Sequence, residues 1–197
     1  MTQVTPALQR LTVQEWADLD TDDRGELVDG CLEEEEMPSA LHEAVALWFA
    51  RVLASWVAAR GGMAFGAELK LSVSARRGRK GDVSVYFPGR PLPGGRAGAT
   101  RRPPSIVVEV LSPRPRDVRR DTVDKLQEYA AFGVSFYWLV DPLARTLEVR
   151  QLDPGGRHVT LLSAADGSHA APGCEGLTLD LDALWTEMDR LPDETEE

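Results

Sequence analysis

Three charged residues lie in otherwise apolar segments, and their chemical types could bind a metal ion or one another. Asp82 opens a run of valine, serine and aromatic residues, Glu109 is flanked by valines, and Lys125 lies within an amphipathic segment. Burying an isolated ionised carboxylate costs several kcal/mol even after the protein relaxes, so Glu109 requires a metal ion or a cationic side chain as a partner. We therefore expect the function of this chain where these three side chains meet.

The segments around Glu109 and Lys125 predict that the two side chains point to a common place. In a strand over residues 106–111, Glu109 shares one face with Val107 and Leu111, and the opposite face carries only apolar residues: Ile106, Val108 and Val110. A helix over about 117–132 has one inward stripe: Val118, Thr122, Lys125, Tyr129 and Phe132. Because the helix directly follows the strand, its lysine can reach back to the glutamate.

Two carboxylates on neighbouring strands suit Mg²⁺, which prefers hard oxygen ligands and retains waters. A metal at Asp82 and Glu109 would polarise a phosphodiester oxygen and lower the pKa of a bound water, and Lys125 would orient that water or offset charge on the phosphorane. The same pattern allows a second interpretation, in which Glu109 and Lys125 form a buried structural ion pair and Asp82 is a strand-end residue.

Local patterns elsewhere predict alternating strands and helices. A capping box at Thr12 and Glu15 begins a short helix, Asp29 and Gly30 form a tight hairpin turn, and Ser39 caps a long helix that ends near residue 60. Further elements are expected as strands over 65–73, 82–87 and 136–140, a basic turn before Asp82, an irregular loop over 88–104 and a hairpin over 147–162. The order strand, helix, strand over 106–140 is typical of a parallel crossover in a sheet that is covered on both faces.

Composition places the chain among soluble globular proteins. With 197 residues and 43% hydrophobic residues it can bury a core, and we expect one domain over 1–197, with its core over about 10–165 and an acidic tail over about 186–197. We expect a cytoplasmic protein with no membrane partner, because no apolar run approaches ~20 residues and the N-terminus lacks a signal-peptide pattern. Cys31 and Cys174 fit neither a disulfide framework nor a zinc cluster.

The charge is distributed unevenly along the chain. Its net charge is −10, yet residues 70–125 hold fourteen Lys or Arg against five Asp or Glu, a local balance of +9 that leaves −19 for the rest. The candidate nucleic-acid-binding residues flank the predicted site: Arg76, Arg77, Arg79, Lys80, Arg114 and Arg116. A polyanion such as DNA is therefore a plausible ligand, although arginines in solvated loops would give the same pattern.

An ordered set of short motifs resembles the Uma-two family of endonucleases in the PD-(D/E)xK, or restriction-endonuclease-like, superfamily. The matching elements, in the family's order over about 10–165, are Glu26 to Gly30, Met37 with His42, Asp82, Glu109, Asp121 with Lys125 and Tyr129, and 133–142. The resemblance implies an α/β fold with a mixed β-sheet flanked by α-helices. It also implies Mg²⁺ or Mn²⁺ as cofactor, Asp82 and Glu109 as metal ligands, Lys125 as the catalytic lysine and Glu26 as a further catalytic-site residue. His42 and Asp121 match as accessory residues.

Two positions depart from the expected pattern. Gly81 replaces the proline that precedes the first aspartate, and Leu111 stands two residues after Glu109 where the superfamily places its lysine, so the lysine must come from the helix. The implied activity is Mg²⁺-dependent hydrolysis of DNA, with a homodimer favoured because one site per chain would have to cut two strands. The alternatives are an inactive nucleic-acid-binding or assembly module with a structural Glu109–Lys125 pair, and an acidic protein-interaction module whose arginines pair with its own carboxylates.

Overall fold

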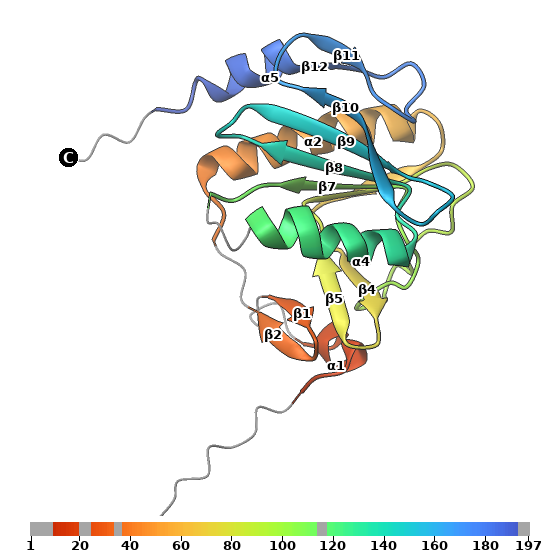
Figure 1. Cartoon of the computed structure of the whole chain (residues 1–197). Helices are drawn as coiled ribbons and strands as arrows, with labels where there is room; N and C mark the ends of the chain where they lie inside the picture. Colours follow the sequence, from red (N-terminus) through yellow and green to blue (C-terminus); the bar gives the residue numbers. More distant parts are fainter. Residues whose placement is uncertain (1–9, 20–24, 34–36, 114–117, 193–197) are drawn as a thin grey trace, which may run out of the picture.

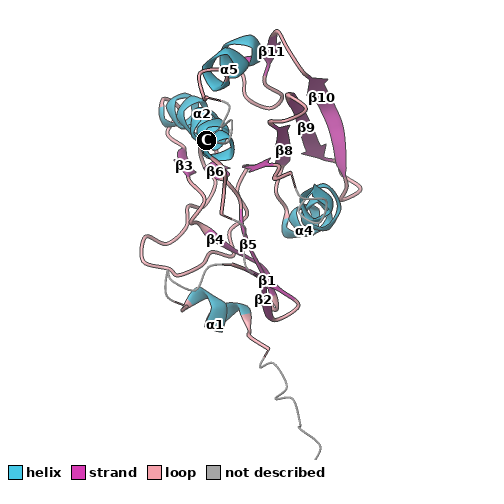
Figure 2. Ribbon diagram, turned by 90° about the vertical axis from the view of Figure 1, so that its left-hand side faces the viewer, coloured by secondary structure: helices cyan, strands magenta, loops and turns pink. Residues whose placement is uncertain are grey.

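The computed structural model describes residues 10–19, 25–33, 37–113 and 118–192, and they form a mixed α/β fold (Figures 1 and 2). A six-stranded sheet has the order β10-β9-β8-β7-β6-β3, in which β7 and β8 are parallel and the other neighbours are antiparallel. Its strands are β3 (Met63–Phe65), β6 (Val83–Tyr86), β7 (Ile106–Val110), β8 (Phe136–Asp141), β9 (Thr146–Leu152) and β10 (His158–Ala164). The predicted α/β class and mixed sheet are confirmed.

A smaller antiparallel sheet lies beside the large one and carries the N-terminal part of the described chain (Figure 1). Its order is β2-β1-β5-β4, with strands β1 (Glu26–Val28), β2 (Cys31–Glu33), β4 (Lys70–Ser74) and β5 (Arg77–Lys80). Helix α1 (Val13–Ala17) packs on it and begins with the predicted capping box at Thr12 and Glu15. The predicted hairpin turn is also confirmed, because Asp29 and Gly30 have φ angles of 49° and 84°.

Helices cover both faces of the six-stranded sheet, α2 (Ala40–Ala58) on one side and α4 (Lys125–Phe132) on the other (Figure 2). Ile106, Val108 and Val110 pack with α2, whereas Val107 packs with Tyr129 of α4. The alternation predicted along the Glu109 strand is therefore confirmed. Of the described helices, α2 alone has the length and composition of a membrane span, but five of its side chains pack in the core: Val45, Trp48, Phe49, Leu53 and Val57.

The core continues past residue 165, the predicted limit. Two short strands, β11 (Ser168–Ala170) and β12 (Thr178–Asp180), precede helix α5 (Leu181–Met188). Leu181, Leu184 and Trp185 of this helix are buried in the same cluster as α2. The acidic tail predicted from about residue 186 thus begins within a packed helix, and 193–197 lie outside the described residues.

Two predicted strand boundaries are wrong for a common reason. The single strand predicted over 65–73 is two strands, β3 and β4, which are separated by a turn at Ala67 and Glu68 and belong to different sheets. The basic turn predicted before Asp82 is itself strand β5. The alternation of apolar residues indicates the face of the sheet on which a side chain lies, but it does not indicate which strand pairs with which.

The helix after the Glu109 strand also differs from its prediction. Residues 120–124 form a π-helical segment, η1 (Arg120–Asp124), which runs directly into α4, and the predicted start at residue 117 lies outside the described residues. Asp121, Lys125 and Tyr129 follow one another at intervals of four residues and are buried, whereas Thr122 of the predicted stripe is only partly buried. An acidic residue thereby joins the lysine inside the protein.

Candidate active site

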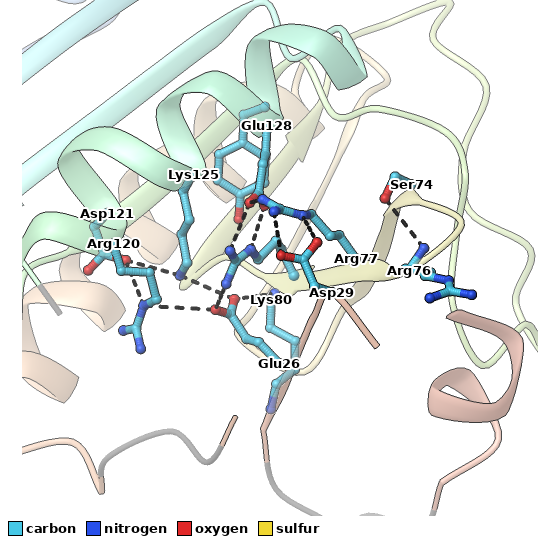
Figure 3. Close-up of polar contacts among 12 residues, drawn as sticks. Glu26, Asp29, Ser74, Arg76, Arg77, Lys80, Arg120, Asp121, Lys125 and Glu128 are labelled. Carbon is cyan, nitrogen blue, oxygen red and sulfur yellow. Dashed lines mark hydrogen bonds and ion pairs between the residues drawn. The ribbon is translucent and has the colours of Figure 1, made fainter. Parts of the chain in front are cut away.

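Lys125 lies at the centre of a buried cluster of carboxylates. Its Nζ is 2.9 Å from Glu109 Oε2, 3.2 Å from Glu26 Oε1 and 3.2 Å from Asp121 Oδ1. Only 3% of the lysine side chain is exposed. Burial alone would lower the pKa of Lys125, but the three carboxylates raise it well above its ordinary value. The ammonium is therefore protonated and holds residues from β1, β7 and η1 together, as Figure 3 shows for Glu26, Asp121 and Lys125.

Two buried tyrosines orient the acidic side of the cluster. The hydroxyl of Tyr129, one turn after Lys125, donates to Glu109 Oε1 at 2.8 Å, and the hydroxyl of Tyr137 donates to the backbone carbonyl of Asp121 at 2.8 Å. Burial raises the pKa of both phenols well above the ordinary value, and the nearby carboxylates raise it further. Both groups consequently remain neutral donors.

Asp82 lies at the edge of the sheet where β6 begins and β7 ends. The pairing of Val83 with Val108 brings Asp82 to the level of Glu109 on the adjacent strand, and Asp82 Oδ2 accepts a hydrogen bond from the backbone N–H of Val110 at 2.7 Å. Its side chain is 16% exposed, more than those of the other cluster members. Burial raises the pKa of Asp82, and His42, the Val110 N–H and Lys125 oppose that rise.

His42, predicted as an accessory residue, lies beside Asp82 in the first turn of α2. Its Nε2 is 3.5 Å from Asp82 Oδ2, and its buried Nδ1 has no hydrogen-bond partner among the described residues. The structure therefore brings His42, Asp82 and the lysine cluster into one region. The first turn of a helix, which the sequence pattern treats as a surface position, is here partly covered, because the histidine side chain is only 13% exposed.

The cations of the cluster are distributed unevenly among its carboxylates. Arg79 pairs with Glu26 and Arg120 with Asp121, whereas Glu109 pairs with Lys125, which it shares with both of these carboxylates. Burial raises the pKa of Glu109 well above its ordinary value; Lys125 opposes this, whereas Asp121, Asp82 and Glu26 raise the pKa further. Such repulsion is relieved by a proton or by an added cation. The electrostatics around Glu109 and Asp82 therefore favour a further positive charge.

These two carboxylates also have the donor chemistry that magnesium requires. In the described part of the chain, no group of three or more His, Cys, Asp or Glu side chains is arranged to hold a metal ion. Mg²⁺, however, is commonly bound by one or two carboxylates while it keeps several waters. Asp82 and Glu109, with hard oxygens and an unbalanced negative charge, fit this mode of binding.

Glu26 has a different environment from the other acidic residues. Its Oε1 accepts from the backbone N–H of Lys80 at 2.9 Å and its Oε2 accepts from Arg79 Nη1 at 2.8 Å, in addition to the contact with Lys125. Burial would raise the pKa of Glu26, but Lys125 and Arg79 lower it to about 2. Glu26 is thus paired with two cations of the protein, Arg79 and Lys125, and it anchors both of them.

The basic residues predicted to contact nucleic acid do not form one surface. Arg79 is 1% exposed and pairs with Glu26 and Glu128, so its predicted place in a surface DNA contact is wrong. Arg77 is 33% exposed and pairs with Asp29 and Glu128, as Figure 3 shows. Other members differ in their positions: Arg76 is exposed, Lys80 is largely buried and pairs with Glu68, and Arg114 and Arg116 lie outside the described residues.

Sequence reasoning missed Glu128, which receives both Arg77 and Arg79. A local signal existed, because Glu128 follows Lys125 by three residues and therefore lies near it on the same helix. Arg120, which lies 3.3 Å from Asp121 and 3.9 Å from Glu26, was counted only as part of the basic segment. The sequence does not reveal the contacts of Glu128 with Arg77 and Arg79 or that of Arg120 with Glu26, because these partners lie on distant strands.

Gly81, where the resemblance leads one to expect proline, has no room for a side chain. A Cβ built there would lie 2.6 Å from Val107 Cγ1 and 3.6 Å from Glu109 Oε1. We expect Gly81→Ala to lower the free energy of unfolding by about 1–3 kcal/mol, since overpacking forces neighbouring groups to shift. Urea denaturation measures this loss, and Gly95→Ala, at an exposed glycine with nothing near its Cβ, is the control. Equal stability of the two variants would contradict the prediction.

Comparisons with known proteins show the fold and the family of this chain. A putative nuclease belonging to DUF820 from Anabaena variabilis ATCC 29413 has a crystal structure with a TM-score of 0.73 and 21% sequence identity, over 90% of this chain and 99% of that one. This likeness shows a shared fold. No curated protein sequence matches the chain. A family model described as "Uma2: Putative restriction endonuclease" matches residues 10–183. The predicted resemblance is thereby confirmed, and the chain belongs to the Uma2 family of restriction-endonuclease-like proteins.

Proposed function

We propose that this protein is a Mg²⁺- or Mn²⁺-dependent endonuclease that hydrolyses phosphodiester bonds of DNA. The observation that carries the proposal is the convergence of Asp82, Glu109 and Lys125 at one edge of the sheet, from two adjacent strands and a crossover helix. Membership of the Uma2 family and the nuclease-like fold support the same activity.

In this proposal Asp82 and Glu109 hold the metal ion. When bound, the ion supplies Lewis-acid polarisation of a phosphodiester oxygen and lowers the pKa of a coordinated water. Glu109 is held in place for this task by Lys125 at Oε2 and by Tyr129 at Oε1, and Asp82 by the Val110 N–H. Such hydrogen bonds fix the direction of the carboxylate oxygens, and supporting contacts of this kind typically change metal affinity or activity by 10–100-fold.

Lys125 contributes positive charge beside the reacting phosphate. Its raised pKa keeps the ammonium protonated at neutral pH, so it can offset negative charge that builds up during hydrolysis. Glu26 and Asp121 hold its Nζ from two sides. The lysine therefore needs little reorganisation during the reaction, which is the condition under which electrostatic stabilisation is most effective.

DNA is the proposed substrate because the segment around the site is basic within an acidic protein. Of the predicted contact residues, Arg76 is exposed on the β4–β5 hairpin and available to a phosphate. We further propose that two chains act together as a homodimer, since each chain offers one site for two strands. The free thiols of Cys31 and Cys174 accord with action in the cytoplasm, where thiols are kept reduced.

One observation favours a second candidate function. Lys125 is 3% exposed, and three carboxylates surround its three N–H donors. This is the arrangement expected of a structural ion pair in an inactive nucleic-acid-binding or assembly module. The pairing of Arg77 and Arg79 with carboxylates of the protein itself likewise follows the pattern of an acidic interaction module. The excess of carboxylates at Glu109 leads us to place the nuclease first.

Plasmid nicking with and without Mg²⁺ or Mn²⁺, combined with calorimetric titration of each ion, tests the proposal. Wild type should bind the ion and nick only in its presence. Asp82→Asn should lower nicking by about 10²–10³-fold, because a metal supplies several kcal/mol of transition-state stabilisation. Its melting temperature should change little, since the amide oxygen can still accept from Val110.

The matched control is Asp166→Asn, at an exposed aspartate in the turn before β11, which should retain full activity and ion binding. If wild type binds neither ion and does not nick, the nuclease proposal fails in favour of the structural ion pair. Nicking that is independent of Asp82 would equally overturn the assignment of this residue as a metal ligand.

A further inference from the structure

Arg79 is an internal cation that joins two acidic residues from different elements. It lies on β5 with 1% exposure, and its Nη1 donates to Glu26 Oε2 at 2.8 Å. Its Nε donates to Glu128 Oε2 at 2.6 Å and its Nη2 donates to Glu128 Oε1 at 2.9 Å, a two-pronged contact. Bidentate pairs of this kind restrict direction as well as distance, so the guanidinium sets where each carboxylate lies.

These contacts close a ring of alternating charges that includes the candidate catalytic lysine. Arg79 binds Glu26, Glu26 Oε1 lies 3.2 Å from Lys125 Nζ, and Lys125 is one helical turn before Glu128, which returns to Arg79. The ring therefore connects β1, β5 and α4, as Figure 3 shows for Glu26, Lys125 and Glu128. Through this ring, the four-stranded sheet fixes the position of α4, and therefore of Lys125, relative to Glu26.

A second arginine holds the same glutamate from the outer side. Arg77 contacts Glu128 and also donates to both oxygens of Asp29, at 3.0 Å and 2.9 Å, in the β1–β2 turn. Arg77 is partly exposed, whereas Arg79 is not. The outer pair can thus be altered without opening the ring, which makes it a useful comparison for the inner one.

We infer that Arg79, with Glu128, is a positioning residue that sets the location of Lys125 and Glu26 for the proposed hydrolysis; the inference rests on that proposed function. Burial prevents Arg79 from touching a surface phosphate. Only the planar fork of arginine can bind Glu128 through two nitrogens while a third reaches Glu26. A lysine at this position has the charge but not the fork.

Steady-state nicking kinetics of Arg79→Lys and Arg79→Met provide the first test. Both variants should lose about 10²-fold in kcat, since a displacement of about 1 Å in a positioned group can cost that much. The KM for DNA and the salt dependence of binding should remain those of wild type. Arg157→Met, at an 82% exposed arginine of the β9–β10 turn, is the control and should leave all three quantities unchanged.

The kinetics can overturn the inference in two ways. A raised KM and a flatter salt dependence with wild-type kcat would show that Arg79 binds substrate phosphate. A wild-type kcat in Arg79→Lys would show that a positive charge at this position is sufficient and that the guanidinium does not position Lys125 or Glu26. Thermal unfolding of each variant identifies those that have failed to fold, and Glu128→Gln, which keeps the side-chain shape, should reproduce the loss of kcat in a folded protein.

A readout that does not require nuclease activity separates this inference from the proposed function. The chain has three lysines, Lys70, Lys80 and Lys125, so acetylation by acetic anhydride followed by peptide mass mapping reports on each one. Lys125, buried and protonated, should react slowly in wild type and several-fold faster in Arg79→Lys and Glu128→Gln, relative to Lys70. Unchanged labelling of Lys125 would overturn the positioning role. Increased labelling in a protein that never nicks DNA would sustain it while the proposed nuclease fails.

Discussion

Replacing Lys125 with methionine should lower the rate of phosphodiester hydrolysis by about 10³-fold or more and should change how stability depends on pH. The catalytic loss follows because a preorganised charge beside a reacting group is commonly worth 10²–10³-fold, and here the same ammonium also orients Glu109. Methionine has a similar length and no charge, so it separates loss of the ammonium from loss of volume.

The stability change has a definite sign. Without the ammonium, Glu26, Glu109 and Asp121 would lie together without their shared partner, and breaking a buried ion pair costs about 3–5 kcal/mol at neutral pH. Burial already raises the pKa of Glu109 in the folded state, and removal of Lys125, which opposes this rise, places that pKa further above its value in the unfolded state. The deficit is therefore fully present at pH 7 and shrinks as pH falls toward 5, because the folded protein takes up protons first.

Urea denaturation of wild type and Lys125→Met between pH 5 and 8, together with plasmid nicking, measures both effects. Gln127→Met is the matched control, because it places the same side chain at an exposed position of the same helix. An inactive but equally stable variant at pH 7 would show that the lysine is catalytic without being a structural centre. A variant as active as wild type would refute the role of Lys125 in hydrolysis.

Glu26→Gln should destabilise the fold by about 3–5 kcal/mol at pH 7, because the buried Arg79 and Lys125 would each lose an anionic partner. The free energy of unfolding should also depend less steeply on pH in the acidic range. The pKa of Glu26 is about 2 in the folded protein against an ordinary value of 4.5, so its ionised form contributes stability above pH 4.5. That contribution is lost as pH falls from 4.5 through about 2, and the variant lacks it throughout.

Denaturation of wild type and Glu26→Gln between pH 2 and 7 distinguishes this effect from general acid unfolding. Glu33→Gln is the control, since Glu33 is the exposed register partner of Glu26 on β2 and keeps the ladder unchanged. Parallel stability curves for wild type and Glu26→Gln over pH 2–4.5 would contradict the depressed pKa. A stability loss no larger than that of Glu33→Gln would contradict the assignment of Glu26 as the anchor of the two cations.

The convergence of Glu109 and Lys125 could be predicted because each depends on a local repeat. A strand turns alternate side chains to opposite faces, so apolar neighbours of Glu109 revealed its face, and Lys125 shares a helical stripe with Tyr129. The contact of Asp121 with Lys125 follows from the same kind of repeat, because the two residues are four apart on one helix. The π-helical form of the segment that carries Asp121 is not indicated by the hydrophobic pattern.

The arginines show the clearest limit. Arg76, Arg77 and Arg79 are near neighbours in the sequence, and the local pattern predicts one role for all three. In the structure the first is exposed, the second forms an outer pair and the third is an internal cation. The burial of Arg79 depends on carboxylates of β1 and α4, which lie about fifty residues away in each direction. The residues around Arg79 in the sequence therefore do not indicate that it is buried. The single strand expected over 65–73 failed for the same reason, because pairing partners are non-local.

Local patterns were enough to predict the fold class, the family, the three charges at the candidate site and the Asp121–Lys125 pair, because periodicity, short motifs and helical spacing are properties of neighbouring residues. The three-dimensional fold was needed to show that Glu26 also contacts Lys125, that Arg79 faces inward and that several carboxylates raise the pKa of Glu109. These facts depend on distances between elements that are far apart along the chain. Electrostatic energies depend on the distances between charges and on their burial, and a local sequence pattern gives neither of these two quantities.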